Sequence, residues 1–269
     1  TEVPSDEIIL NYGNFSINGN MLEVFSHEYA RIPESEMNDT IILGGEVYNF
    51  GYEDQFNVSF ESSILNSNEI EIISNTKVID TIENYNTVYI QDTISNFTPL
   101  AIDKYKFNLT ISSDGDNSSG QNFSNNSFSR CFAITENLFS TDGIGIYDDE
   151  SLSLSVLGTN SFIDNEDGLI IMVTYEITEE TIVNGLEVLI SNDDSYSSDA
   201  EIIPFIKHFD PFGLIGTSSF DPYDRIIEGD FISVQDWHLN EGKIWLPFEE
   251  YNTTLNPGIY HVGVELYSG

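Results

Sequence analysis

Apolar and polar residues alternate along most of the chain, which is the pattern of half-buried β-strands. Short runs rich in Ile, Val, Thr, Tyr and Phe recur, and clusters of Asn, Asp, Ser and Gly separate them as turns would. In the two clearest runs, the residues that share one face are Tyr105, Phe107, Leu109 and Ile111, and then Phe128, Arg130, Phe132 and Ile134. We expect both faces to line a core.

Two successive series of such runs predict the domain organisation. About seven runs over roughly 110 residues precede "TENLFSTDG" (135–143), and this matches the strand count of an immunoglobulin-type β-sandwich. A second series extends from "SLSLSVLG" (151–158) to "GIYHVGVELYS" (258–268). Helix formers such as Ala, Lys and Arg are rare. The sequence therefore predicts an all-β chain with two tandem β-sandwiches.

Domain boundaries follow from the same series. We expect the first sandwich over 34–140 and the second over 141–269. Residues 1–33 either supply strands to the first sandwich or are the remnant of a preceding module. The Pro- and Gly-rich stretch 208–224 predicts a long extended loop within the second sandwich.

Charge narrows the choice of partners. The chain has 46 acidic and only 8 basic residues, a formal net charge of −38. Such a surface repels phosphate backbones and anionic lipid heads, so we expect no nucleic-acid partner. The longest uninterrupted apolar run, 169–173, is far too short to cross a bilayer, so we expect no membrane insertion. Adaptation to salty water and ordered calcium sites are two explanations of the acidity.

The first half resembles a known family. Residues 28–64 are similar to the opening of immunoglobulin-like, CARDB-like repeats in secreted proteins of Bacteroidetes, and 103–135 are similar to the closing hairpin of such repeats. The matching residues are Tyr29, Ile32, Pro33, Val47, Asn49 and Gly51 in the opening and Asp114, Asn125 and Asn126 in the hairpin. The resemblance implies an extracellular or cell-surface protein exported by the type IX secretion system.

The second half resembles the jelly-roll-like module that follows these repeats. The matching residues are Trp245, Pro247, Phe248, Leu255, Gly258, Tyr260, Val262, Gly263, Val264 and Glu265. Further strands follow in the family, so the resemblance implies that the second domain is incomplete at residue 269.

No combination of residues predicts catalysis. The four histidines, His27, His208, His238 and His261, form no metal-binding pair at short spacing, and we expect each at the surface, with His261 pointing to solvent. The single cysteine, Cys131, cannot form an internal disulfide and reads as a small apolar strand residue. Acidic residues are too numerous for a glycosidase pair to be chosen by spacing. We therefore predict no catalytic residue.

Calcium is the candidate cofactor, because hard cations bind clustered carboxylates and carbonyls. The candidate ligands are Asp114, Asp116, Asp164, Asp167, Asp193 and Asp194. The alternative for each cluster is a solvated loop.

Carbohydrate binding is the candidate ligand chemistry. Asp236, Trp237 and His238 lie in the loop-like "QDWHLNEG" (235–242), where Trp237 would form an exposed platform, whereas Trp245 is expected in the core. Two functions follow. The first is a non-catalytic structural or adhesive segment, such as a stalk, adhesin or filament in which copies of the chain exchange a strand. The alternative is a polysaccharide-binding module or accessory domain of a secreted hydrolase.

Overall fold

The chain divides into two compact units, Thr1–Leu152 and Ser153–Gly269, hereafter unit 1 and unit 2. The computed structural model describes residues 7–16, 21–22, 25–26, 28–37, 39–95, 100–115, 123–147, 152, 154–158, 167–191, 200–209, 221–248 and 254–267. Strands dominate this part of the chain, which confirms the all-β prediction. Within it, no helix has the length and apolar character needed to cross a membrane.

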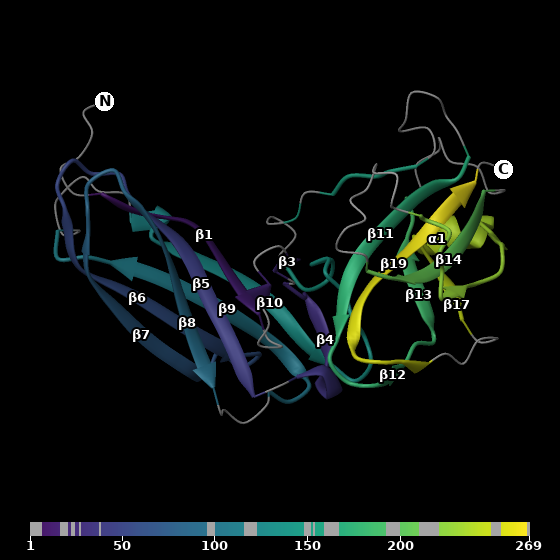
Figure 1. Ribbon diagram of the computed structural model, residues 1–269, viewed down its shortest axis with the longest axis horizontal. Coiled ribbons are helices and arrows are strands. Elements are labelled where there is room, and N and C mark those ends of the chain that lie inside the picture. Colours follow the sequence, from purple (N-terminus) through teal and green to yellow (C-terminus); the bar gives the residue numbers. More distant parts are fainter. Residues whose placement is uncertain are drawn as a thin grey trace. The chain divides into compact units, whose positions relative to one another are not determined.

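Unit 1 is a sandwich of two sheets (Figure 1). One sheet has the strand order β1-β5-β8, and the other has the order β4-β10-β9-β6-β7. All the pairs are antiparallel except β4 with β10, which is parallel. The elements are β1 Ile8–Ser16, β2 Met21–Leu22, β3 Phe25–Ser26, β4 Arg31–Pro33, η1 Glu34–Glu36, β5 Thr40–Asn49, β6 Gln55–Asn66, β7 Glu71–Ile82, β8 Thr87–Ser95, β9 Asp103–Ser112, η2 Phe123–Asn125 and β10 Ser127–Thr135.

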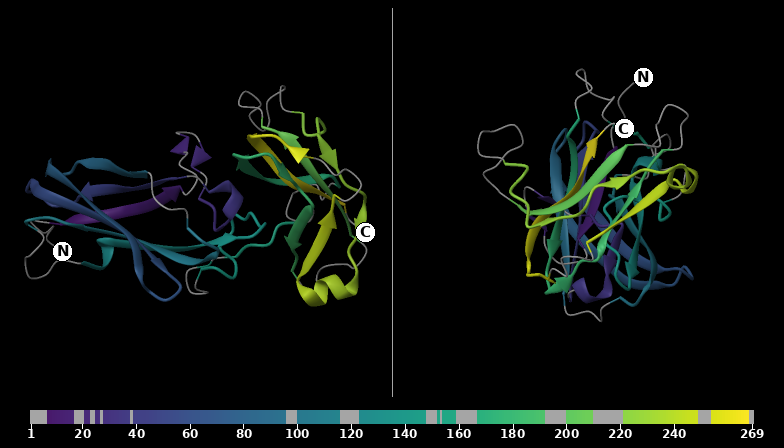
Figure 2. Two further views of the ribbon diagram at one scale, coloured as in Figure 1. Left: turned by 90° about the horizontal axis from the view of Figure 1, so that it is seen from below. Right: turned by 90° about the vertical axis from the view of Figure 1, so that its right-hand side faces the viewer.

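The core of unit 1 is aromatic and lies between the two sheets. Figure 2 shows the purple strand β1 and the teal strand β10 in different layers. Phe15 of β1 crosses the gap, with its ring 5.6 Å from that of Phe107 and 5.0 Å from that of Phe132. The alternating face of β9 is buried as predicted, from Tyr105 to Ile111. Alternation along β9 therefore gives the core side of this sheet correctly.

The family-like residues Tyr29, Ile32, Val47 and Asn49 are core residues of unit 1. Tyr29, Ile32 and Val47 are fully buried, and so is Asn49. The Asn49 amide donates to the carbonyls of Glu53 and Ile82 at 2.9 and 3.0 Å, and its oxygen accepts the Gly51 N–H at 3.0 Å. The Asn49 side chain thus closes the turn at this Asn-x-Gly step, and its buried amide is paired.

The strands within residues 1–33 and the segment around Ser140 belong to unit 1. Strand β1 pairs along its length with β5, and β4 pairs with β10, so 1–33 supplies strands to the first sandwich. The expected boundary near residue 140 falls inside unit 1, because Ser140 forms a β-bridge with Arg31. Sequence reasoning placed it too early because the bridge joins residues more than one hundred positions apart.

Unit 2 is built on one larger sheet with the order β11-β19-β14-β15, in which β16 also pairs with β14. Strands β13 and β17 form a second, two-stranded sheet, and β12 pairs with β18. The elements are β11 Leu169–Ile177, β12 Thr181–Ile182, β13 Gly185–Leu189, β14 Glu201–His208, β15 Ile227–Glu228, β16 Ile232–Ser233, α1 Asp236–Glu241, β17 Lys243–Pro247, β18 Thr254–Leu255 and β19 Gly258–Tyr267. Whether this unit follows jelly-roll topology stays a prediction.

The apolar core of unit 2 lies between the larger sheet and the β13–β17 sheet. Ile202 and Val264 from the larger sheet pack in one cluster with Ile244 and Leu246 of β17. Successive residues of β14, from Ile202 to Lys207, are all buried. Both faces of this strand are therefore covered, unlike the strands of unit 1 that alternate between core and water.

Candidate functional site

The segment after β10 folds back onto the edge strand β4 of unit 1. The Ser140 N–H donates to the Arg31 carbonyl at 3.0 Å, and the Ser140 carbonyl accepts the N–H groups of Ala30 and Arg31 at 2.8 and 3.0 Å. The reversal between β10 and Ser140 is closed by Thr135, whose hydroxyl accepts the Leu138 N–H at 3.0 Å. The edge of this sheet is thus covered by the protein's own chain rather than left open.

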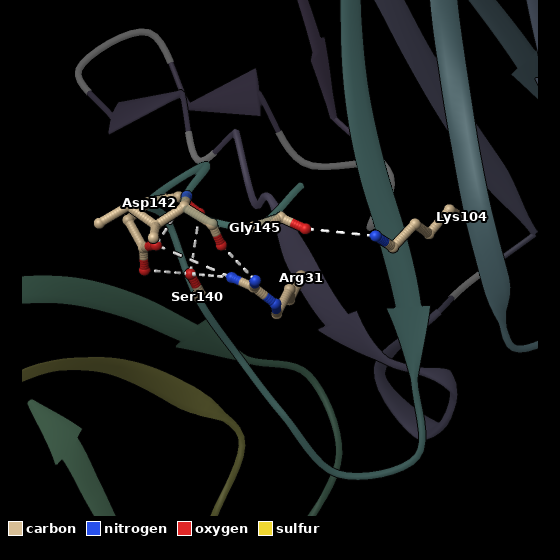
Figure 3. A network of polar contacts seen from close by, with 6 residues as sticks. Arg31, Lys104, Ser140, Asp142 and Gly145 are labelled. Carbon is tan, nitrogen blue, oxygen red and sulfur yellow. Dashed lines mark hydrogen bonds and ion pairs between the residues drawn. The ribbon is translucent and has the colours of Figure 1, made fainter. Parts of the chain in front are cut away.

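The Arg31 side chain fastens this segment (Figure 3). Its Nη1 donates to the Ser140 hydroxyl at 3.3 Å and lies 3.7 Å from Asp142 Oδ1, while its Nη2 donates to the Ile144 carbonyl. Asp142 in turn accepts the Ile144 N–H at 3.0 Å, which fixes the turn that presents that carbonyl. We refer to Arg31, Ser140, Asp142 and Ile144 as the Arg31 clamp. Charge-assisted hydrogen bonds to several successive groups hold a strand more firmly than one ladder bond does.

Two further cations of unit 1 extend the attachment. Lys104 Nζ donates to the Gly145 carbonyl at 3.2 Å, further along the segment than the contacts of Arg31 (Figure 3). Arg130 lies 5.7 Å from the centre of the Tyr147 ring and also forms an ion pair with Glu28. Three of the chain's 8 basic residues therefore bind the outgoing segment to the sandwich. The sequence did not predict that these basic residues hold the segment, although their rarity in so acidic a chain indicates that each has a specific partner.

The predicted carbohydrate residues lie on the short helix α1 (Figure 2). Trp237 is 56% exposed and its ring centre lies 3.6 Å from that of His238. His238 is buried, which corrects the prediction of a surface histidine: its Nδ1 accepts the Gln235 N–H at 2.9 Å and so caps the helix. Asp236 is exposed in the first turn. The structure brings the three together, but His238 is occupied by capping rather than offered to a ligand.

Trp245 is exposed, so the prediction of a core residue is wrong. It lies on β17 between buried Ile244 and Leu246 and is 50% exposed. Strand alternation places it on the outer face, with Glu187 as its partner on β13. Sequence reasoning failed because the family-like "W-x-x-x-P-F" run does not say which face of the strand meets the core.

His261 is also buried, against the expectation that it points to solvent. The exposed fraction of His261 is 9%, and its Nδ1 lies 3.0 Å from the Thr174 hydroxyl. Burial, and then the charge of nearby Lys207, lowers the pKa of His261. Its strand β19 lies between β11 and β14, and neighbouring residues such as Val264 and Glu265 are both buried, so both faces of β19 are covered. Alternation cannot reveal such a covering.

A buried ion pair anchors that second face. Arg225 Nη2 donates to Glu265 Oε2 at 2.5 Å, with side chains 3% and 2% exposed. The Arg225 guanidinium also lies 4.3 Å from the centre of the Phe205 ring. Tyr267 donates to Glu265 Oε1 at 2.7 Å, and this hydrogen bond is the main cause that raises the pKa of Tyr267 to about 12. Every oxygen of the buried carboxylate is thereby satisfied, which makes the pair a structural anchor.

The calcium prediction remains open. Asp114 is exposed, and its carboxylate accepts a hydrogen bond from Asn57; Asp167 is exposed at the start of unit 2's strands. Asp116, Asp164, Asp193 and Asp194, like His27, lie outside the described residues. Among the described residues, no group of three or more His, Cys, Asp or Glu side chains could hold a metal ion.

Comparisons with known proteins give distant likenesses. No protein-family model matches this chain, and no curated protein matches it. The CARDB domain of a Pyrococcus furiosus protein, in complex with di-metal ions, aligns with 11% identity and a TM-score of 0.32 over 50% of this chain and 95% of that one. A domain from Methanosarcina acetivorans, provisionally named as part of a cell surface protein, aligns with 22% identity and a TM-score of 0.23 over 35% of this chain and 76% of that one.

A β-glucuronidase from glycoside hydrolase family 2 aligns with 16% identity and a TM-score of 0.27 over 35% of this chain. The match covers 10% of that enzyme, so the chain spans a small part of its length. At these TM-scores the likenesses assign no function to the chain.

Proposed function

We propose that this chain is a non-catalytic structural segment of an extracellular or cell-surface protein, in which unit 1 is a load-bearing link. One observation carries the proposal: β4, which follows the N-terminal strand β1, and β10, the last strand of unit 1, pair in parallel. Arg31, Ile32 and Pro33 lie opposite Ala133, Ile134 and Thr135, and the Ala133 N–H donates to the Ala30 carbonyl at 2.8 Å.

Parallel pairing determines how a pull is resisted. The incoming side of β4 and the outgoing side of β10 lie at opposite ends of the pair, so tension slides one strand along the other. All the hydrogen bonds between the strands are then loaded together. In an antiparallel pair pulled at one end, the bonds break one after another. Shear of a whole ladder therefore needs more force than unzipping.

The Arg31 clamp supports the same role. Tension that enters unit 1 from beyond Tyr147 meets the contacts of Lys104, Arg31 and Ser140 before it reaches β10. These contacts fasten the outgoing segment both to the edge strand β4 and to β9. A link of this kind keeps its ends attached while a more distant part of the chain binds its target.

The mechanical role can be tested by pulling single molecules from two directions. In a Cys131→Ser background, handles on cysteines at positions 28 and 136, which flank the parallel pair, load β4 against β10 in shear. Handles on cysteines at the exposed positions Ile102 and Glu136, next to the register pair Asp103 and Ile134, unzip β9 from β10. We expect unit 1 to unfold at a clearly higher force in the first geometry. Equal forces in both geometries would remove the basis of the proposal.

The surface location and export by the type IX secretion system are parts of the same proposal and rest on the sequence resemblance. Antibodies against this chain should label intact cells of the source organism, and protease added outside the cells should remove the label. Labelling that appears only after lysis would contradict the extracellular role, whatever the mechanical result.

A further inference from the structure

The outer face of the β13–β17 sheet presents a flat aromatic surface. Trp245 faces away from the core, because its neighbours Ile244 and Leu246 are the buried residues of β17. On the adjacent strand, Gly185 pairs with Pro247, and a side chain at 185 would lie 2.8 Å from Cζ2 of the Trp245 indole. The benzene ring of Trp245 therefore occupies the space over Gly185.

This packing orients the indole. With Gly185 beside it, the benzene ring of the indole extends over the backbone of β13, while half of the Trp245 side chain stays exposed. Any larger residue at 185 would collide both with the indole and with the Leu246 carbonyl, 2.4 Å from the added Cβ. A glycine under an exposed tryptophan is thus a feature that this pair of strands requires.

Hydrogen-bonding groups border the exposed ring. Glu187 lies directly opposite Trp245 in the ladder, and Lys243 precedes it on the same face. Lys243 Nζ and Glu187 Oε2 are 2.9 Å apart, with side chains 49% and 44% exposed, so both keep donor and acceptor capacity toward solvent. We refer to Trp245, Gly185, Glu187 and Lys243 as the tryptophan platform.

We propose that the tryptophan platform binds a neutral polysaccharide, a role beyond the load-bearing function of unit 1. A pyranose ring has an apolar C–H face that stacks on an indole and a rim of hydroxyls that pair with groups such as Glu187 and Lys243. The net charge of −38 disfavours anionic polymers, and a nucleobase would arrive with a phosphate backbone that the chain repels.

The size of the platform favours a glycan over a protein partner. Strands β13 and β17 have 5 residues each. Their outer face therefore measures about 16 Å by about 10 Å. Stable protein interfaces bury about 800 Å² on each partner, several times this area. A few sugar units of a single polysaccharide chain fit the available length.

The chain offers a direct optical test, because it contains 2 tryptophans, Trp237 and Trp245. In a Trp237→Phe variant, Trp245 is the sole indole reporter. The probes are hexasaccharides of cellulose, xylan, mannan and starch, with an alginate hexasaccharide as the anionic control. We expect at least one neutral hexasaccharide to shift or quench the Trp245 emission, and alginate to leave it unchanged.

Matched variants locate the site. Trp245→Ala should weaken binding to that hexasaccharide about tenfold or more, whereas Trp245→Tyr, which keeps an aromatic face, should weaken it less. Trp237→Ala is the control at an exposed tryptophan outside the platform and should bind as the unmodified chain does. Thermal unfolding checks that each variant is folded.

Three results would overturn the proposal: no response to any neutral hexasaccharide, undiminished binding by Trp245→Ala, or loss of binding with Trp237→Ala alone. Trp245-dependent self-association in sedimentation, without glycan binding, would equally replace it with an interface between copies. None of these results bears on the force measurements on unit 1, so the two proposals can fail separately.

Discussion

The two units present opposite strand geometries to a pull along the chain. In unit 1, β4 and the last strand, β10, are parallel, so tension that reaches them shears their ladder. In unit 2 the first and last strands, β11 and β19, are antiparallel neighbours, and Leu169 at the start of one pairs with Leu266 at the end of the other. Tension across unit 2 therefore opens that ladder from one end, bond by bond.

The units also differ in where their charged groups lie. The Arg31 clamp of unit 1 is at the rim, with the Asp142 side chain 51% exposed. In unit 2, the charged side chains of Arg225 and Glu265 form an ion pair that is almost completely buried. Unit 1 is thus reinforced where load arrives from the C-terminal side, whereas unit 2 depends on an internal ion pair. This division suits a link joined to a binding module.

The largest expected effect is on the internal ion pair of unit 2. Arg225→Ala leaves the Glu265 carboxylate buried without its partner and should lower the free energy of unfolding of unit 2 by about 3–5 kcal/mol. Lys243→Ala removes a half-exposed ion pair of the same unit and should change the free energy of unfolding far less, because solvent screens that pair. Denaturant titration of both variants measures the difference. A loss of similar size in both would show that Arg225–Glu265 is no special anchor.

A smaller effect is expected at the clamp of unit 1. Arg31→Ala removes the side-chain bonds to Ser140 and Ile144 and should make local opening of 139–147 easier by about 1–3 kcal/mol. Hydrogen exchange of the Ser140 and Ile144 amides measures this opening, while exchange in β9 should be unaltered. Asp39→Ala, at an exposed position of the same unit, is the control. Unchanged exchange at Ser140 in Arg31→Ala would mean that the backbone bridge alone holds the segment.

Acidification should weaken unit 2 through His261. The folded-state pKa of His261 is lowered, so the unfolded chain binds that proton more readily and the free energy of unfolding falls as pH drops below about 6.5. The loss is at most about 1.4 kcal/mol per pH unit and stops once the pH is below the folded-state pKa. Thermal unfolding between pH 7.5 and 5.5 should show a smaller dependence in His261→Asn. An identical dependence in that variant would place the titration elsewhere.

The smallest effect is expected at Trp245. Since this side chain faces water, Trp245→Ala should change the free energy of unfolding by about 0.5 kcal/mol or less. Leu246→Ala, one position further along β17, empties a core site and should cost about 2–5 kcal/mol. Denaturant titration of this pair tests the strand orientation. A core-sized loss in Trp245→Ala would contradict the outward placement.

The local pattern was enough to predict the strands and which residues share a face, but it did not show whether one or both faces of a strand are buried. Alternation in β9 placed Phe107 and Leu109 correctly in the core, because the opposite face of that strand meets water. The same reasoning failed for His261 in β19, since the pattern groups residues by face but does not show whether the second face is covered. The prediction for Trp245 was wrong because a large aromatic residue was assumed to lie in the core.

Long-range contacts and very short elements could not be predicted from the sequence. The Arg31 clamp joins residues 109 positions apart, and Arg225 pairs with a residue 40 positions away, so neither spacing forms a motif. Helix α1 has 6 residues, too few for a helical period to appear. Its cap residues, Gln235 and His238, are uncommon in that role.

Pulling the whole chain from its two ends in an optical trap tests the central claim most directly. Unit 1 is the longer unit, so its unfolding releases more chain than that of unit 2, and the two events can be told apart. We predict that unit 2 unfolds before the β4–β10 pair of unit 1 separates, and at lower force; detachment of β1 from β5, which the tension reaches first, would be a separate and shorter step. If the longer release comes first, the parallel β4–β10 pair does not make unit 1 a load-bearing link.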